Sequence, residues 1–272
     1  MPPEMPPETA PLKALSPRPD SARKAAVLAL RQQLARLEGV PRDETRALPF
    51  GVLALDRHLP HGGLAFGTVH EIAPATEADM PAAFGFLLAL MGRLPGGTPL
   101  LFVRTARKFA RNGNPHGRGL QALGLDPARL TLVEAADDTE TLWATEEALR
   151  AEGPCAVASA FGGKIDLKSS QRLHRAAREA GLPLLVLRPE RATPVPTAAT
   201  RWHIATVPGR RDRFGLIAGW RWRAILERCR NGRPGDWMLE FDHATHRFAL
   251  AAAMAGASLF DGGTKASAAD AG

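Results

Sequence analysis

The stretch "HEIAPATEADMPAAFGF", residues 70–86, decides the fold, because it joins a buried strand to an apolar helix through a short loop. Its first part continues an apolar run, which predicts a strand over residues 68–72. Its last part predicts a helix over residues 81–94, with Pro81 suited to the first turn. This helix is apolar nearly all round, so we expect it to be buried.

The loop between this strand and this helix lies where many nucleotide-binding proteins hold phosphate. Such loops read G-x-x-x-x-G-K-[ST], because glycine N–H groups surround the phosphates and the lysine reaches them. This loop has no lysine and no glycine before Gly85, and it carries Glu77 and Asp79. Two carboxylates would repel a triphosphate, although acidic residues also favour the start of a helix. Neither role favours ATP binding.

Strands and helices alternate along the chain that follows. The segment "TPLLFVRT", residues 98–105, is apolar without alternation, as in a parallel sheet covered on both faces. A basic, glycine-rich loop follows over residues 106–119, and after residue 195 the pattern changes to hairpin-linked strands. We therefore predict an α/β fold, a mostly parallel sheet flanked by helices, with antiparallel strands at the C-terminal end. Further strands are expected over residues 128–135, 155–161 and 182–188, and helices over residues 120–128, 137–153 and 166–181.

Residues that start and stop helices support two of these elements. Asp137 and Glu140 are spaced as a capping box at the start of one helix. Asp166 can cap the next helix, and Gly181 can end it.

The composition divides the chain into four parts. We expect a disordered arm over residues 1–19, a helix and linker over 20–47, one core domain over 48–252 and a flexible tail over 253–272. In the helix, residues 21–38, one apolar face is formed by Val27, Leu30, Leu34 and Leu37. This face requires a partner, which is either the chain's own core or another molecule.

The bulk properties limit the class of protein. The chain has 272 residues and a formal net charge of +7, and 45% of its residues are hydrophobic, as in a soluble globular protein. It shows neither a signal peptide at its start nor an apolar run that could cross a bilayer. Cys155 and Cys229 suit a reducing cytosol. The arginine excess fits DNA as a partner, and it fits the codon bias of a GC-rich genome equally well.

An arginine-rich stretch over residues 201–233 has acids only at Asp212 and Glu227. Tryptophans alternate with arginines in it, a pattern that suits single-stranded DNA or a protein hot spot. The alternative is an edge strand with charges outward and tryptophans inward. The candidate DNA- or partner-binding residues are Arg210, Arg211, Arg213, Arg221, Trp222 and Arg223.

No metal or hydrolytic site stands out in the sequence. The eight histidines include no H-x-x-x-H pair, and neither cysteine has a second ligand at metal spacing. No G-x-S-x-G elbow is present. We therefore expect neither a metal nor another cofactor.

Three phrases, taken in order, resemble a known family. "FGVLALDRHLPHGGLAFGTVHEIAP", residues 50–74, resembles the entry to the RecA core, and "LQALGLDPARLTLVEA", residues 120–135, resembles the approach to a later core strand. "WRWRAILERCRNGRPGDWMLEF", residues 220–241, is similar to the ImuA family of RecA-like proteins, which are sometimes described as SulA-like. The likeness covers roughly residues 20–250 and implies a RecA-like core behind an N-terminal helix.

This resemblance implies an ATPase site that has lost its chemistry. A working site of this class needs a phosphate loop, a carboxylate after the second strand, an aspartate for Mg²⁺ after the fourth and a polar sensor after the fifth. The chain instead has Thr105, Ser159 and Arg188 near the ends of those three strands. The degenerate phosphate loop comprises Ala73, Pro74, Thr76, Glu77 and Asp79.

The resemblance also implies a function. It points to a non-catalytic adapter in the damage-induced (SOS) mutagenesis that depends on translesion DNA synthesis. The implied partners are ImuB and an error-prone DNA polymerase III alpha-type subunit, with RecA as a further candidate, weak DNA binding and no membrane. Such a protein would be cytoplasmic and could join the nucleoid after damage. Helix 21–38 stands where RecA has a helix that docks on the neighbouring protomer. The alternatives are a divergent ATPase, a DNA-binding protein acting through residues 201–233, and a SulA-type division inhibitor.

Overall fold

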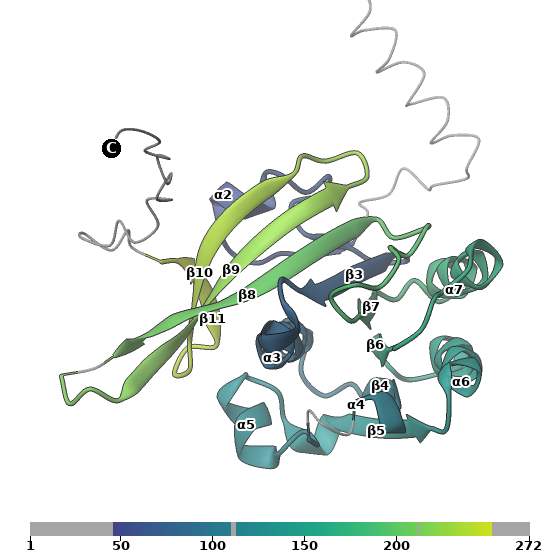
Figure 1. The fold of residues 1–272 in the computed structure, drawn as a ribbon, viewed down its shortest axis with the longest axis horizontal. Helices are drawn as coiled ribbons and strands as arrows, with labels where there is room; N and C mark the ends of the chain where they lie inside the picture. The colour runs from purple at the N-terminus through teal and green to yellow at the C-terminus, as the bar shows by residue number, and fades with distance from the viewer. Residues whose placement is uncertain (1–45, 110–112, 212, 252–272) are drawn as a thin grey trace, which may run out of the picture. The chain divides into compact units, whose positions relative to one another are not determined.

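A sheet of nine strands runs through the described part of the chain, which comprises residues 46–109, 113–211 and 213–251 of this computed structural model (Figure 1). The predicted arm over residues 1–19, the helix over 21–38 and the tail over 253–272 lie outside the described residues.

The strand order is β11-β10-β9-β8-β3-β7-β6-β4-β5. The parallel strands are β3 (Val69–Pro74), β4 (Leu100–Thr105), β5 (Leu130–Ala135), β6 (Ala156–Ala160), β7 (Leu184–Leu187) and β8 (Thr200–Arg211). The antiparallel strands are β9 (Ile217–Cys229), β10 (Gly235–Asp242) and β11 (Arg247–Leu250). The predicted α/β class, the mostly parallel sheet and its antiparallel C-terminal extension are therefore confirmed.

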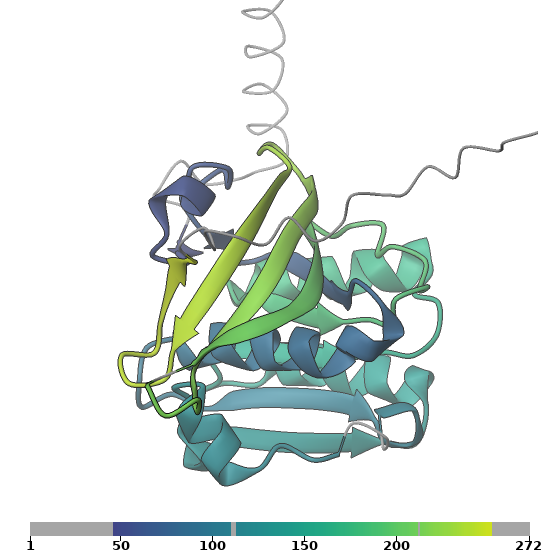
Figure 2. The ribbon, with the colours of Figure 1, turned by 60° about the vertical axis from the view of Figure 1, so that its left-hand side comes forward.

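Helices cover both faces of this sheet (Figures 1 and 2). α3 (Met80–Gly92) and α5 (Gly117–Ala122) pack on one face, and α6 (Asp138–Arg150) and α7 (Leu167–Ala180) pack on the other. A small separate sheet pairs β1 (Ala47–Leu48) with β2 (Leu64–Ala65). The remaining short elements are α2 (Leu53–Asp56), α4 (Ala106–Phe109) and the 3₁₀ helices η1 (Glu77–Asp79) and η3 (Pro127–Arg129).

Asp137 and Asp166 cap α6 and α7 as predicted, but the Glu140 carboxylate accepts from the backbone N–H of Ala136, one residue before the cap, so the predicted capping box is not closed. The Asp137 carboxylate accepts a hydrogen bond of 2.8 Å from the backbone N–H of Glu140 at the start of α6. The Asp166 carboxylate accepts one of 2.7 Å from Ser169 at the start of α7. Gly181 ends α7 with a φ of 63°, which is the left-handed conformation that glycine adopts without strain.

The predicted helix over residues 120–128 is wrong in its bounds. The structure begins α5 at Gly117 and ends it at Ala122, and a separate 3₁₀ turn starts at Pro127. The predicted loop over 106–119 likewise contains α4 and the start of α5. Glycines in the segment predicted a loop, but burial of Leu120 against the core outweighs their low helix propensity.

An aromatic cluster joins α3 to the strands on the β8 side of the sheet. The Phe86 ring of α3 lies 5.8 Å from that of Trp222, 5.8 Å from that of Phe248 and 6.2 Å from that of Trp202, between ring centroids. Phe50, which precedes α2, completes the cluster. These contacts hold β8, β9 and β11 against α3, over which the strands of this side pass (Figure 2).

Gly63 allows a close approach between the two strands of the small sheet. A Cβ atom at this position would lie 2.5 Å from the backbone carbonyl carbon and oxygen of Leu48. Any larger residue must therefore push these two segments of backbone apart.

We expect Gly63→Ala to lower the free energy of unfolding by about 1–3 kcal/mol, the usual cost of overpacking. Gly96→Ala is the matched control, because a Cβ atom there meets nothing within 4 Å. Chemical denaturation of the two variants and the wild type measures the difference. Equal stability of both variants would show that the β1–β2 contact is not formed in solution.

Candidate functional site

The carboxyl ends of the parallel strands are the first place to search for a site. In open α/β sheets, ligands bind outside these ends, where neighbouring strands send their connections to opposite faces. Here β3 continues into α3 on one face, and β7 continues along residues 188–199, whose Val195 packs on the other face. The loop after β3 therefore stands at this switch point.

The Asp79 carboxylate fixes this loop to the sheet. One oxygen accepts hydrogen bonds from the Thr76 backbone N–H at 3.1 Å and from the Thr76 hydroxyl at 2.7 Å. The other oxygen accepts a bond of 2.8 Å from the backbone N–H of Thr206 on β8. Burial would raise the pKa of Asp79, but the bonds from Thr206 and Thr76 outweigh it and lower that pKa. Asp79 is therefore a charged anchor, while Glu77 is exposed.

Aromatic side chains fill the space between α3 and the ends of β4 and β7. Phe84, Phe102 and Phe109 line it, and the Phe84 and Phe102 ring centroids are 5.5 Å apart. The remaining cavity has a volume of about 10 Å³. That is roughly the space of one water molecule, so the aromatic side chains close this internal gap.

Polar groups at the end of β4 are bound to the chain itself. The guanidinium of Arg104 pairs with Glu134 at 2.6 Å and donates a bond of 2.9 Å to the carbonyl of Gly113. These groups border a hollow of about 440 Å³ that also includes Arg107 and Asn114. Because Arg104 is buried and bonded to its own chain, its charge stabilises the fold.

Asp138 holds together the ends of β4 and β6. Its carboxylate accepts a bond of 2.6 Å from the Thr105 hydroxyl, and bonds of 3.2 and 2.6 Å from the backbone N–H groups of Gly162 and Gly163. Sequence reasoning missed this role, because Asp138 follows the capping residue Asp137 and looks like a second helix-start acid.

Two buried charges on the α7 face, Glu71 and Arg188, and the partly buried Arg201 beside them were also missed. Glu71 of β3 is fully buried and accepts a bond of 2.9 Å from the Val195 N–H, and it lies 3.7 Å from the guanidinium of Arg201. Burial raises the pKa of Glu71, against the effect of Val195 and Arg201. Arg188 at the end of β7 is fully buried and donates a bond of 3.2 Å to the carbonyl of Phe161. These charges join three strands inside the protein.

The arginine-rich stretch forms the β8–β9 ribbon, and several of its charges meet acids of β10. Arg210 and Arg221 both bind the Glu240 carboxylate, and the Arg221–Glu240 distance is 2.8 Å. Arg223 forms an ion pair of 2.6 Å with Asp236. The acids lie beyond residue 233, so counting charges along the stretch missed them. The role of these arginines in binding DNA or a partner stays a prediction.

The other candidates in this stretch differ in exposure. Arg211 is exposed and donates a bond of 2.6 Å to the carbonyl of Gly215, while Arg213 lies over the Phe214 ring at 4.7 Å from its centroid. Trp222 is only 5% exposed and packs in the aromatic cluster. The outward arginine at Arg223 and the inward Trp222 follow the predicted alternation, but the predicted edge position is wrong, because β9 pairs with both β8 and β10.

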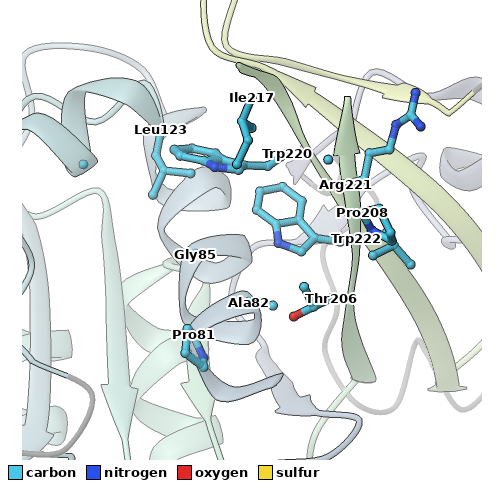
Figure 3. Close-up of a pocket in the computed structure, with 13 residues that line it drawn as sticks. Pro81, Ala82, Gly85, Leu123, Thr206, Pro208, Ile217, Trp220, Arg221 and Trp222 are labelled. Atoms are coloured by element: carbon cyan, nitrogen blue, oxygen red, sulfur yellow. The ribbon is translucent and has the colours of Figure 1, made fainter. Parts of the chain in front are cut away.

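An apolar groove, which we call the α3–ribbon groove, lies between α3, α5 and the β8–β9 ribbon (Figure 3). Its volume is about 700 Å³. Beside it, the tip of the ribbon extends beyond the sheet (Figure 1) and exposes Phe214 by 71%, Leu216 by 65% and Ile217 by 56%. The groove is lined by Pro81, Ala82, Gly85, Gly119, Leu123, Thr206, Val207, Pro208, Gly209, Ile217, Trp220, Arg221 and Trp222.

The remaining features concern the N-terminal helix, metal binding, a buried histidine and membrane spans. The partner-binding face of Val27, Leu30, Leu34 and Leu37 lies outside the described residues. Among the residues that the structure describes, no group of three His, Cys, Asp or Glu side chains could hold a metal. Burial lowers the pKa of His70 to about 4, so this histidine is neutral. No helix in the described ranges is long and apolar enough to cross a membrane.

Comparison with known proteins gives a relative but no family model. No protein-family model matches the sequence. Protein ImuA of Caulobacter vibrioides, in strains NA1000 and CB 15, is 36% identical over 240 residues. The match covers 80% of this chain and 94% of that protein.

We expect Asp79→Ala to lower the melting temperature at pH 7, because it frees the loop from β8. The hydrogen bonds hold the folded-state pKa of Asp79 below the ordinary value of about 3.9. This stabilisation is therefore present above that value and is lost as the pH falls through the folded-state pKa. Thermal melts at pH 7 and pH 3 should show the gap between variant and wild type narrowing in acid.

Glu77→Ala is the matched control, because Glu77 is an exposed acid in the same loop. A melting temperature for Asp79→Ala that equals that of Glu77→Ala at pH 7 would contradict the anchoring role.

Proposed function

Because the chain belongs to the ImuA family, we propose that it acts as a non-catalytic, RecA-like adapter in damage-induced mutagenesis. The adapter binds ImuB and the error-prone DNA polymerase III alpha-type subunit, with RecA as a further partner. It thereby brings together the proteins that copy damaged DNA.

Two features of the structure support the non-catalytic part of this proposal. The aromatic side chains of Phe84, Phe102 and Phe109 leave about 10 Å³ between α3 and the ends of β4 and β7. The loop that would hold phosphate instead binds its own chain through Asp79. Both features favour a core that was kept for its surface rather than for chemistry, and they count against a divergent ATPase.

The pairing of the ribbon arginines favours protein partners over DNA. Arg210, Arg221 and Arg223 lie in ion pairs with Glu240 and Asp236. Binding to phosphate would have to compete with these carboxylates, which leaves Arg211 and Arg213 as the more available charges. We therefore propose weak, salt-sensitive DNA binding at most.

Co-purification tests the adapter function directly. The full chain, carrying an affinity tag, is mixed in turn with purified ImuB, the polymerase subunit and RecA. We expect it to retain ImuB and the polymerase subunit. Failure to retain either of them, together with nanomolar DNA binding at physiological salt, would replace the adapter with a DNA-binding protein.

We expect no binding of Mg-ATP at millimolar concentration, because the phosphate loop and the acids for magnesium are absent from the sequence. Isothermal titration calorimetry measures it, with Mg²⁺ alone as the control. A saturable heat in the micromolar range would instead establish a divergent nucleotide-binding protein.

We expect Leu30→Asp and Leu34→Asp to abolish association with RecA or with a second copy of the chain, with little change in melting temperature. Helix 21–38 would then dock its apolar face on another molecule, and each buried leucine contributes roughly 2 kcal/mol. Gln32→Asp, on the polar face of the same helix, is the matched control for the added charge. Lower melting temperatures with association intact would show that the helix packs on its own core.

A further inference from the structure

We propose that the α3–ribbon groove binds an acidic amphipathic helix of a partner protein. This inference rests on the proposed adapter function, and it assigns that function a surface and a class of ligand.

The groove is built to receive apolar side chains. Its volume of about 700 Å³ lies in the range of ligand-binding pockets, roughly 300–1,000 Å³. Trp220, Trp222 and Leu123 present rings and a branched chain to it, while Ala82 and Gly85 leave the α3 side open (Figure 3). An amphipathic helix can place apolar residues spaced by three and four positions into such a groove.

The edge of β8 beside the groove is unsuited to an added strand. β3 pairs with β8 only as far as Ile204, so the distal part of β8 lies at an edge. The Thr206 N–H is already bonded to Asp79, and Pro208 has no N–H to donate. An extended peptide would therefore find few backbone partners, whereas a helix needs none.

The charges around the groove favour an acidic ligand. The chain has no acidic residue between Ala106 and Leu125, the segment that supplies the α5 wall and its exposed Arg118. On the ribbon, Arg211 pairs across the sheet with Ile217, which lines the groove, so both side chains share that face. Arg221 is turned away from Gly85 (Figure 3), and its guanidinium donates a hydrogen bond to Glu240.

The acids near the groove do not reverse this balance. Asp79 is engaged by Thr76 and Thr206, which leaves the exposed Glu77 as an acid at the start of α3. Asp212 belongs to the ribbon tip in sequence and lies outside the described residues.

The same charges argue against the chain's own N-terminal helix as the ligand. Residues 21–38 carry four cations and one anion, so a second copy would bring positive charge to a positive rim. A partner helix with acidic residues beside its apolar face matches both the groove and the rim. The charged residues of segment 21–38 are Arg23, Lys24, Arg31, Arg36 and Glu38.

Photo-crosslinking identifies the ligand. The full chain carries p-benzoylphenylalanine at Ile217, which is 56% exposed at the groove, or at Leu167 of α7, which is 57% exposed and serves as the matched control. Each is irradiated with purified ImuB, the polymerase subunit and RecA, and mass spectrometry locates the linked peptide. We expect Ile217 alone to link to an acidic segment with helical apolar spacing. A basic or strand-like segment, or residues 21–38 of a second copy, would overturn the proposal.

A filled groove separates this inference from the proposed function. Gly119→Phe places a ring at the groove, and Gly96→Phe places one elsewhere, since a Cβ atom at either glycine meets nothing within 4 Å. We expect Gly119→Phe to weaken capture of the partner by roughly tenfold or more and Gly96→Phe to leave it unchanged. If both variants capture as the wild type does, the groove assignment is wrong while the adapter function stands. If the wild type captures none of the three proteins, the adapter function itself fails.

Discussion

The burial of α3 is the constraint on which the rest of the fold depends. This helix, "MPAAFGFLLALMG", has no charged residue, so most of its surface has to be covered by other elements. The sheet covers one side through β3, β7 and β8. Phe248 of β11 and Trp222 of β9 cover another, as do Leu120 of α5 and Leu123 directly after it. The antiparallel strands therefore complete the core that the parallel strands begin.

The α3–ribbon groove follows from the same constraint. Cover is complete along the C-terminal half of α3, where residues 86–91 are all buried. It is incomplete at Pro81, Ala82 and Gly85, which line the groove. The residues there are small and uncharged, so they leave an open, apolar surface. The α3–ribbon groove therefore lies where the packing of other elements against the apolar helix α3 ends.

The fold could be predicted from the sequence where the signal is local. Apolar runs located the strands, and Asp137, Asp166 and Gly181 marked helix ends through side-chain and backbone chemistry that acts within a few residues. The segment 106–128 was misread because its glycines favour a loop locally, while the core that buries Leu120 is assembled from distant residues. Tertiary packing then outweighs propensity.

The candidate site could be predicted less well, because its groups meet only through long-range pairing. Glu240 neutralises Arg221 and Arg210 across three strands, a relation that no count along residues 201–233 can show. Glu71 and Arg188 belong to strands that read as apolar, and their burial depends on neighbours more than a hundred positions away. The groove is assembled from three separate segments with no shared motif. The sequence did indicate that the loop after β3 lacks the lysine and glycines of a phosphate-binding loop.

The bond between Asp79 and Thr206 bears on how a complex with partner proteins forms and dissociates. In an ATPase, the phosphate loop changes its contacts with each turnover, and that cycle can expel a partner. Here the loop is tied to β8 by its own carboxylate, and the tie does not depend on any nucleotide. Under the proposed function, no cycle of nucleotide binding and hydrolysis releases the partners from the complex. It would form at a rate that depends on how much of each component the cell makes and dissociate at a rate set by the contacts alone, so gene expression would govern how much of the complex is present.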